Sequence, residues 1–65
     1  MNIGKSLRLA MEKNDKSREQ LASEIDRSVS YVNQLRRAES MNLDTVTMLA
    51  VAFDMKVSEF VALGE

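Results

Sequence analysis

The sequence contains no cysteine and no histidine among its 65 residues. Without cysteine it cannot form a disulfide framework or a thiolate zinc site. Without histidine it lacks the most common nitrogen metal ligand and the most common general base. No paired carboxylates and no glycine-rich phosphate loop are placed to act, so we predict no catalytic residues, no metal, no cofactor and no small-molecule ligand.

Long apolar runs are also absent, since no stretch approaches the roughly 20 residues that span a bilayer. The N-terminal Met-Asn-Ile-Gly-Lys is not followed by an unbroken apolar stretch and does not resemble a secretory signal. We therefore expect a cytoplasmic protein that makes no membrane contact. A chain of this length is expected to form one domain over residues 1–65.

Proline is absent and glycine occurs only twice, whereas strong helix formers such as Leu, Ala, Met, Glu, Lys and Arg are plentiful. This composition predicts an all-α fold. Apolar spacing and capping residues predict five helices. The first three run from about Ile3 to Lys13, from Ser17 to near Asp26, and from Ser28 to Arg37 or Ala38. The fourth runs from Asn42 through Phe53, and the fifth is a short segment capped by Ser58. The fourth has the clearest amphipathic pattern and should form the floor of the core.

Residues 17–37 have the spacing of a helix-turn-helix. Ser17 and Gln20 form the pattern of a capping box, and Ser28 caps the next helix about three residues after the first one ends. The small side chain of Ala22 allows the second helix to approach closely. Apolar side chains expected to fill the angle between the two helices are Leu21, Ile25, Val32 and Leu35.

Charge is distributed unevenly along the chain, although the formal net charge is only −1. Residues 1–38 carry eight basic and five acidic side chains, a net of +3, and residues 39–65 carry one basic and five acidic, a net of −4. No acidic residue lies between Arg27 and Arg37. The pattern is consistent either with chance scatter of solvated charge or with a basic functional face on an acidic body.

The segment Ser17-Arg-Glu-Gln-Leu-Ala-Ser-Glu-Ile-Asp-Arg-Ser-Val-Ser-Tyr-Val-Asn-Gln-Leu-Arg-Arg37 resembles the motif of the phage repressor and Cro family of helix-turn-helix regulators. The segments Asn42–Asp54 and Val57–Leu63 resemble the two helices that follow it in that family, so the similarity covers nearly the whole chain. The resemblance implies a compact five-helix, lambda-repressor-like domain. It also implies a sequence-specific transcriptional regulator, acting in a bacterial cell or a phage-infected host on nucleoid DNA.

The same resemblance implies roles for individual residues. Those at positions that contact bases in the family are Val29, Ser30, Asn33 and Gln34. Physically, Asn and Gln can each bond to adenine and Val can pack on a thymine methyl group, although Val29 could also extend the apolar core. Residues expected to meet the DNA backbone are Arg18, Arg27, Arg36, Arg37 and Asn42.

Departures from the family pattern occur at several positions. The turn holds Asp26-Arg27 instead of Gly and an apolar residue, and Arg27 must extend to solvent or phosphate unless the turn differs locally. Met11 and Arg36 occupy the positions of a common Arg–Glu ion pair. Lys16 stands where an apolar residue is common, and Ala38 where a glycine is common.

So small a domain contacts few base pairs, and each is worth about 1–3 kcal/mol. Two copies contacting half-sites roughly 34 Å apart would discriminate better, which predicts a homodimer on a palindromic operator, formed either in solution or only on DNA. Residues expected at the dimer contact are Val57, Phe60, Val61 and Leu63. Two alternatives remain at this point, a protein-interaction module with a degenerate helix-turn-helix, and an antitoxin or controller protein of the same fold.

Overall fold

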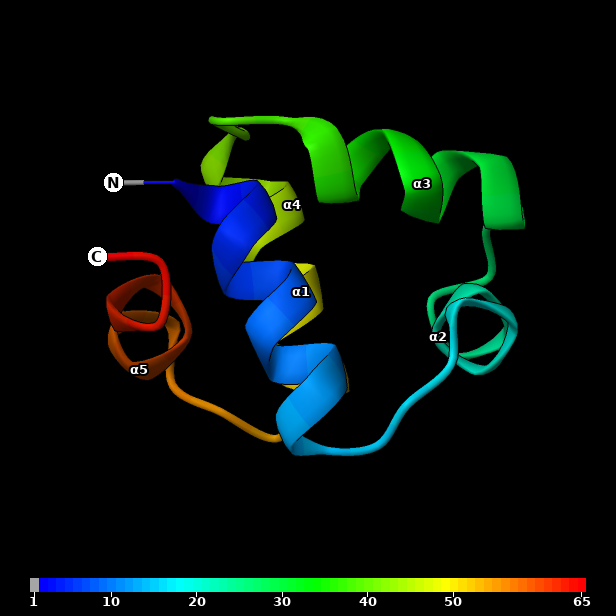
Figure 1. Cartoon of the computed structure of the whole chain (residues 1–65), viewed down its shortest axis with the longest axis horizontal. Helices are drawn as coiled ribbons and strands as arrows, with labels where there is room; N and C mark the ends of the chain where they lie inside the picture. Colours follow the sequence, from blue (N-terminus) through cyan, green and yellow to red (C-terminus); the bar gives the residue numbers. More distant parts are fainter. Residues whose placement is uncertain (1) are drawn as a thin grey trace.

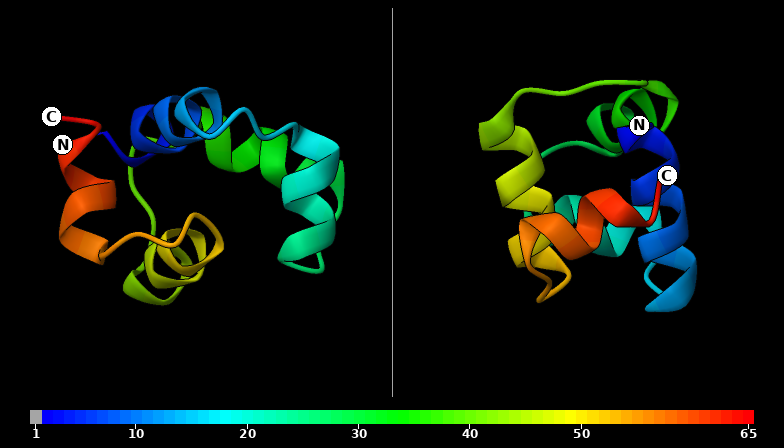
Figure 2. Two further views of the ribbon diagram at one scale, coloured as in Figure 1. Left: turned by 90° about the horizontal axis from the view of Figure 1, so that it is seen from below. Right: turned by 90° about the vertical axis from the view of Figure 1, so that its left-hand side faces the viewer.

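The computed structural model describes residues 2–65, which form five α-helices and no strand. The helices are α1 (Ile3–Lys13), α2 (Arg18–Glu24), α3 (Val29–Arg37), α4 (Leu43–Ala52) and α5 (Val57–Ala62). Helix α3 runs across one side of the molecule, and α1 lies between α2 and α5 (Figure 1). Seen from below, α1 and α4 lie on opposite sides of the molecule (Figure 2, left). The all-α, five-helix prediction is confirmed.

Side-chain caps set the beginnings of four helices. Asn2, Ser17, Ser28 and Asn42 each have an extended backbone, and each side chain accepts a hydrogen bond from the amide three residues ahead. Only one half of the predicted Ser17–Gln20 capping box forms, because the Gln20 amide donates to Ser17 Oγ at 3.1 Å without a return bond from the Gln20 side chain.

The predicted cap of the fifth helix is wrong by two residues. Helix α5 begins at Val57 and its N-cap is Lys56, so Ser58 lies inside the first turn. Glu59 Oε1 accepts a hydrogen bond from the Lys56 amide at 2.9 Å. A carboxylate in the first turn is favourable there, because it lies near the positive end of the helix dipole. That bond satisfies the amide of the N-cap residue without any help from the serine.

Three helices end in the same motif, with an aspartate in the left-handed region. Asp15, Asp26 and Asp54 have φ angles of 51°, 57° and 55°, and each is the second residue after its helix. In each case the next residue donates its amide to a carbonyl five positions back, at 2.8–2.9 Å, which is the bond of a Schellman motif. Asp26 therefore supplies the left-handed backbone of the helix-turn-helix turn without a glycine.

A single apolar core joins all five helices. Its largest fully buried apolar side chains are Phe60, Leu7, Leu21, Leu49 and Val32. The residues predicted to fill the angle of the helix-turn-helix are all buried, as is the small Ala22. The helix-turn-helix geometry therefore rests on the packing that its apolar spacing predicts.

Helix α4 differs from its predicted amphipathic pattern. Val46, Leu49 and Ala50 are buried and do form one side of the core. Leu43 and Val51, however, are 71% and 72% exposed. Apolar side chains thus lie on both faces of α4. The burial of one face holds the helix in place, although the other face is not polar throughout.

The two glycines serve close approach of backbone segments, and neither has a positive φ. A Cβ at Gly4 would lie 2.2 Å from the carbonyl oxygen of Ala38, and one at Gly64 would lie 2.1 Å from that of Asn2. The Gly4 amide donates to this same Ala38 oxygen at 2.8 Å. The start of α1 is therefore fastened directly to the end of α3.

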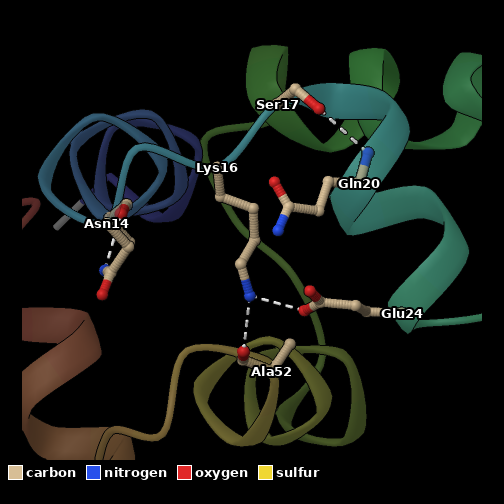
Figure 3. A network of polar contacts seen from close by, with 7 residues as sticks. Asn14, Lys16, Ser17, Gln20, Glu24 and Ala52 are labelled. Atoms are coloured by element: carbon tan, nitrogen blue, oxygen red, sulfur yellow. Dashed lines mark hydrogen bonds and ion pairs between the residues drawn. The ribbon is translucent and has the colours of Figure 1, made fainter.

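Lys16 closes the side of the core between α2 and α4. Its ammonium group bonds to Glu24 Oε1 at 2.5 Å and to the Ala52 carbonyl oxygen at 2.9 Å (Figure 3). The same nitrogen lies 4.8 Å from the centroid of the Phe53 ring. Lysine can thus occupy a position where an apolar residue is common, because its side chain is only 12% exposed and its charged end has partners. None of the helices in residues 2–65 is long and apolar enough to cross a membrane.

Candidate nucleic-acid interface

The outer face of α3 is the exposed surface of the helix-turn-helix. Val32 and Leu35 point into the core, while Val29, Ser30, Gln34 and Arg37 are exposed. Val29 is 36% exposed and belongs to this outer face, so it is not part of the buried core. The face therefore presents one small apolar side chain, a hydroxyl, an amide and a guanidinium group, side-chain types that contact base edges in a major groove.

Asn33 differs from its neighbours on this face. It is half-buried, and its Oδ1 accepts a hydrogen bond from Arg18 Nη1 at 3.3 Å. A guanidinium group has only donors, so the oxygen of the amide must face Arg18. The amide nitrogen of Asn33 is the part that stays available for another partner. Bidentate bonding to adenine requires both amide atoms, and Arg18 occupies one of the two lone pairs of the oxygen.

Arginines gather beside this face at the junction of α1, α2 and α3. Arg18 comes from the start of α2, and Arg36 and Arg37 come from the end of α3. The structure adds Arg8 of α1, whose Nη1 donates to the Arg36 carbonyl oxygen at 2.6 Å. An open hollow of about 340 Å³ is lined by these four arginines and Asn33.

Arg8 is the residue of this group that the sequence did not reveal. It lies in a helix that the motif does not include, ten residues before Arg18. Arg8 lies four residues after Gly4, so both residues face the same side of α1, the side on which Gly4 contacts the end of α3. That contact itself is visible only in the folded chain.

Two other residues expected at the DNA backbone have partners within the protein. The guanidinium group of Arg27 lies 5.7 Å from the centroid of the Tyr31 ring, and its Nη1 donates to the Asp26 carbonyl oxygen at 3.2 Å. Arg27 thus extends outward, as the polar turn requires. Asn42 is exposed, and its Oδ1 accepts from the Thr45 amide at 2.8 Å, so its side-chain oxygen caps α4.

The substitutions at the usual ion-pair and glycine positions have local explanations. Met11 is buried in the core, where its flexible thioether side chain fills space without a charge to pair. Arg36 forms no ion pair with a carboxylate of residues 2–65, and it is half-buried beside Arg8. Ala38 has φ −76° and ψ 140°, an extended backbone that needs no glycine.

One residue expected at the dimer contact is misplaced by the sequence prediction. Phe60 is fully buried and packs on Phe53, with ring centroids 6.3 Å apart, so it is not available at the surface. Val57, Val61 and Leu63 are half-buried. The most exposed large apolar side chains of the described chain are instead Leu43 and Val51 of α4.

Comparison with known proteins gives one family. The profile of the Cro/C1-type HTH DNA-binding domain matches residues 6–63, which covers all of α2 to α5 and most of α1. No curated protein is similar enough to count as a match.

Proposed function

Because the chain belongs to the Cro/C1-type helix-turn-helix DNA-binding family, we propose that it is a sequence-specific regulator of transcription. In this proposal α3 enters the major groove of double-stranded DNA and Val29, Ser30 and Gln34 contact base edges. The finer form of the proposal is a Cro-like repressor that binds a palindromic operator. Such a protein would act in the cytoplasm of a bacterial cell or of a phage-infected host.

The observation that carries the proposal is the arrangement of the exposed α3 face beside the arginines. Base-contacting side chains supply sequence preference, whereas arginines beside them supply most of the affinity through phosphates. Four arginines line the hollow beside α3, and Arg37 among them belongs to the exposed α3 face, although the chain as a whole has a net charge of −1. Local charge can therefore attract DNA where overall charge does not.

A homodimer is the second part of the proposal. A single α3 contacts few base pairs, and a two-fold pair would contact two half-sites about one helical turn apart. Val57, Val61 and Leu63 remain candidates for the contact through their partly exposed surfaces, and Leu43 and Val51 add apolar surface on α4. Sedimentation should detect two chains on a palindromic duplex, and one chain per duplex at saturating protein would contradict the dimer.

The salt dependence of DNA binding tests the proposal most simply. Affinity for duplex DNA should fall steeply with rising salt, because each phosphate neutralised by an arginine releases counterions. Fluorescence anisotropy with a labelled duplex at several salt concentrations gives the slope. An affinity that does not depend on salt would contradict the proposed contact with the DNA backbone.

A further inference from the structure

The hollow beside α3 has a composition that no single helix supplies. Arg8, Arg18, Arg36 and Arg37 line it together with Asn33, and no carboxylate is among its lining residues. In residues 2–65 the one ion pair joins Lys16 to Glu24, so none of the four arginines forms an ion pair with an acidic side chain. Four like charges around one small space repel one another, and an anion placed between them would relieve that repulsion.

Two internal hydrogen bonds hold this arrangement open. Arg8 uses one N–H for the Arg36 carbonyl oxygen, and Arg18 uses one for Asn33 Oδ1. A guanidinium group has five N–H donors, so each of these two arginines is positioned and still has donors to offer. The Asn33 amide nitrogen is a further donor. The hollow is therefore lined by oriented donors, as an oxyanion requires.

From this geometry we infer that the hollow is a preformed site for one phosphate group, with Arg8, Arg18 and Arg36 as its principal donors. Guanidinium groups match phosphate oxygens through pairs of parallel N–H bonds, which favours phosphate over a monatomic anion. The inference rests on the proposed function for the source of that phosphate, which is the DNA backbone beside the groove that α3 enters. Asn33 then belongs to the phosphate side of the interface rather than to the base contacts.

The neighbouring hollow does not share this property. It measures about 470 Å³ and is lined by Arg8, Arg18, Arg36 and Lys16, but three acidic residues line it as well, Glu12, Asp15 and Glu19. Mixed charge makes it a poor anion site. The phosphate is thus expected on the α3 side of Arg8, away from the end of α1.

The test has one arm with a free phosphate and one with DNA. In the first, the melting temperature of the protein is measured in pyrophosphate and in chloride at equal ionic strength. Wild type should melt at a higher temperature in pyrophosphate, because a ligand that binds only the folded state stabilises it. The variant R8Q should lose this increase, and R8K should keep part of it. The control K13Q removes the same charge from an exposed position on α1 that lines neither hollow.

In the second arm, the salt slope of duplex binding is measured for the same proteins. R8Q should bind all sequences more weakly and lower the magnitude of the slope relative to K13Q by up to about 0.9, the contribution of one phosphate, since Arg18 and Arg36 remain. Each variant is compared with its own melting temperature in chloride, so a change in folding stability does not imitate a change in anion binding. If R8Q and K13Q behave alike in both arms, the proposed phosphate site is wrong, while the proposed DNA-binding function still stands. If wild type binds no DNA but R8Q still loses the pyrophosphate effect, the site stands and the proposed function fails.

Discussion

The ammonium nitrogen of Lys16 lies 2.5 Å from Glu24 Oε1, which ties the connection between α1 and α2 to the last turn of α2. The same nitrogen bonds to the carbonyl oxygen of Ala52 at the end of α4. One side chain thus links two helices across an edge of the core, at a position where related proteins commonly have an apolar residue. The four-carbon stem of lysine covers the apolar edge while its charged end reaches two oxygens.

Replacing Lys16 with alanine should lower the free energy of unfolding by about 1–3 kcal/mol, because it removes both bonds and the apolar stem. Lys16→Met should recover most of this loss, since a well-packed apolar side chain often equals a buried ion pair. Urea denaturation measures both values. Lys13→Ala, at an exposed lysine at the end of α1, is the control and should change stability little. A K16A variant as stable as K13A would contradict the bridging role.

The three left-handed aspartates should each be sites of stabilising substitution. Glycine at Asp15, Asp26 or Asp54 removes a strained backbone and a negative charge from the negative end of a helix dipole. We expect a gain of about 1 kcal/mol for each change, measured by thermal or urea unfolding. Asparagine at the same positions separates the two causes, since it removes the charge and keeps the side chain.

Asp44→Gly is the matched control for these substitutions. Asp44 lies in the first turn of α4, where its backbone is helical and its charge favours the helix dipole. Glycine should therefore destabilise the protein there. Loss of stability at Asp15, Asp26 and Asp54 similar to that at Asp44 would show that the turns need the aspartate side chains.

Gly4→Ala should destabilise the protein although alanine is the better helix former. In an ordinary helix this change stabilises by about 0.5–1 kcal/mol. Here the added Cβ would lie 2.2 Å from the Ala38 carbonyl oxygen and 2.8 Å from that of Arg36. The backbone would have to move, and we expect a net loss of more than about 1 kcal/mol. Lys5→Ala, at the adjacent exposed position, should have little effect, and a stabilised G4A variant would contradict the close approach.

Gln34 and Arg37 should affect DNA binding in different ways. Gln34→Ala should cost about 1–3 kcal/mol and relax specificity at one base pair, because it removes a base contact. Arg37→Ala should weaken binding to all sequences about equally and reduce the salt slope, because it removes a phosphate contact. Competition binding with single-base variants of a bound duplex separates the two effects. Equal losses on every duplex for both variants would remove Gln34 from the base contacts.

The fold was predictable from local signals that agree with one another. Ser17, Ser28 and Asn42 cap helices where the sequence indicates, and the apolar spacing of Leu21, Ile25, Val32 and Leu35 gives the buried angle of the helix-turn-helix. These signals depend on residues within one or two helical turns. Composition favoured an all-helical fold, since strong helix formers dominate and proline is absent.

Apart from the cap of α5, the errors came from packing between helices, which local signals do not reveal. Phe60 lies on an apolar stripe that could face a partner or the core, and its contact with Phe53 decides for the core. Leu43 and Val51 share a helix with buried residues, and only the packing of α4 shows that they are exposed. Arg8 joins the interface because Gly4 brings α1 against the end of α3, a contact across more than thirty residues of sequence.

Selection of bound sequences from a random pool of duplex DNA tests the central claim most directly. If the chain is a sequence-specific regulator that binds as a dimer, the pool should converge on a palindrome whose half-sites are spaced by about one helical turn. Gln34→Ala should then lose preference at one position within each half-site. A pool that remains random, although the protein retains DNA at low salt, would contradict sequence-specific recognition by α3.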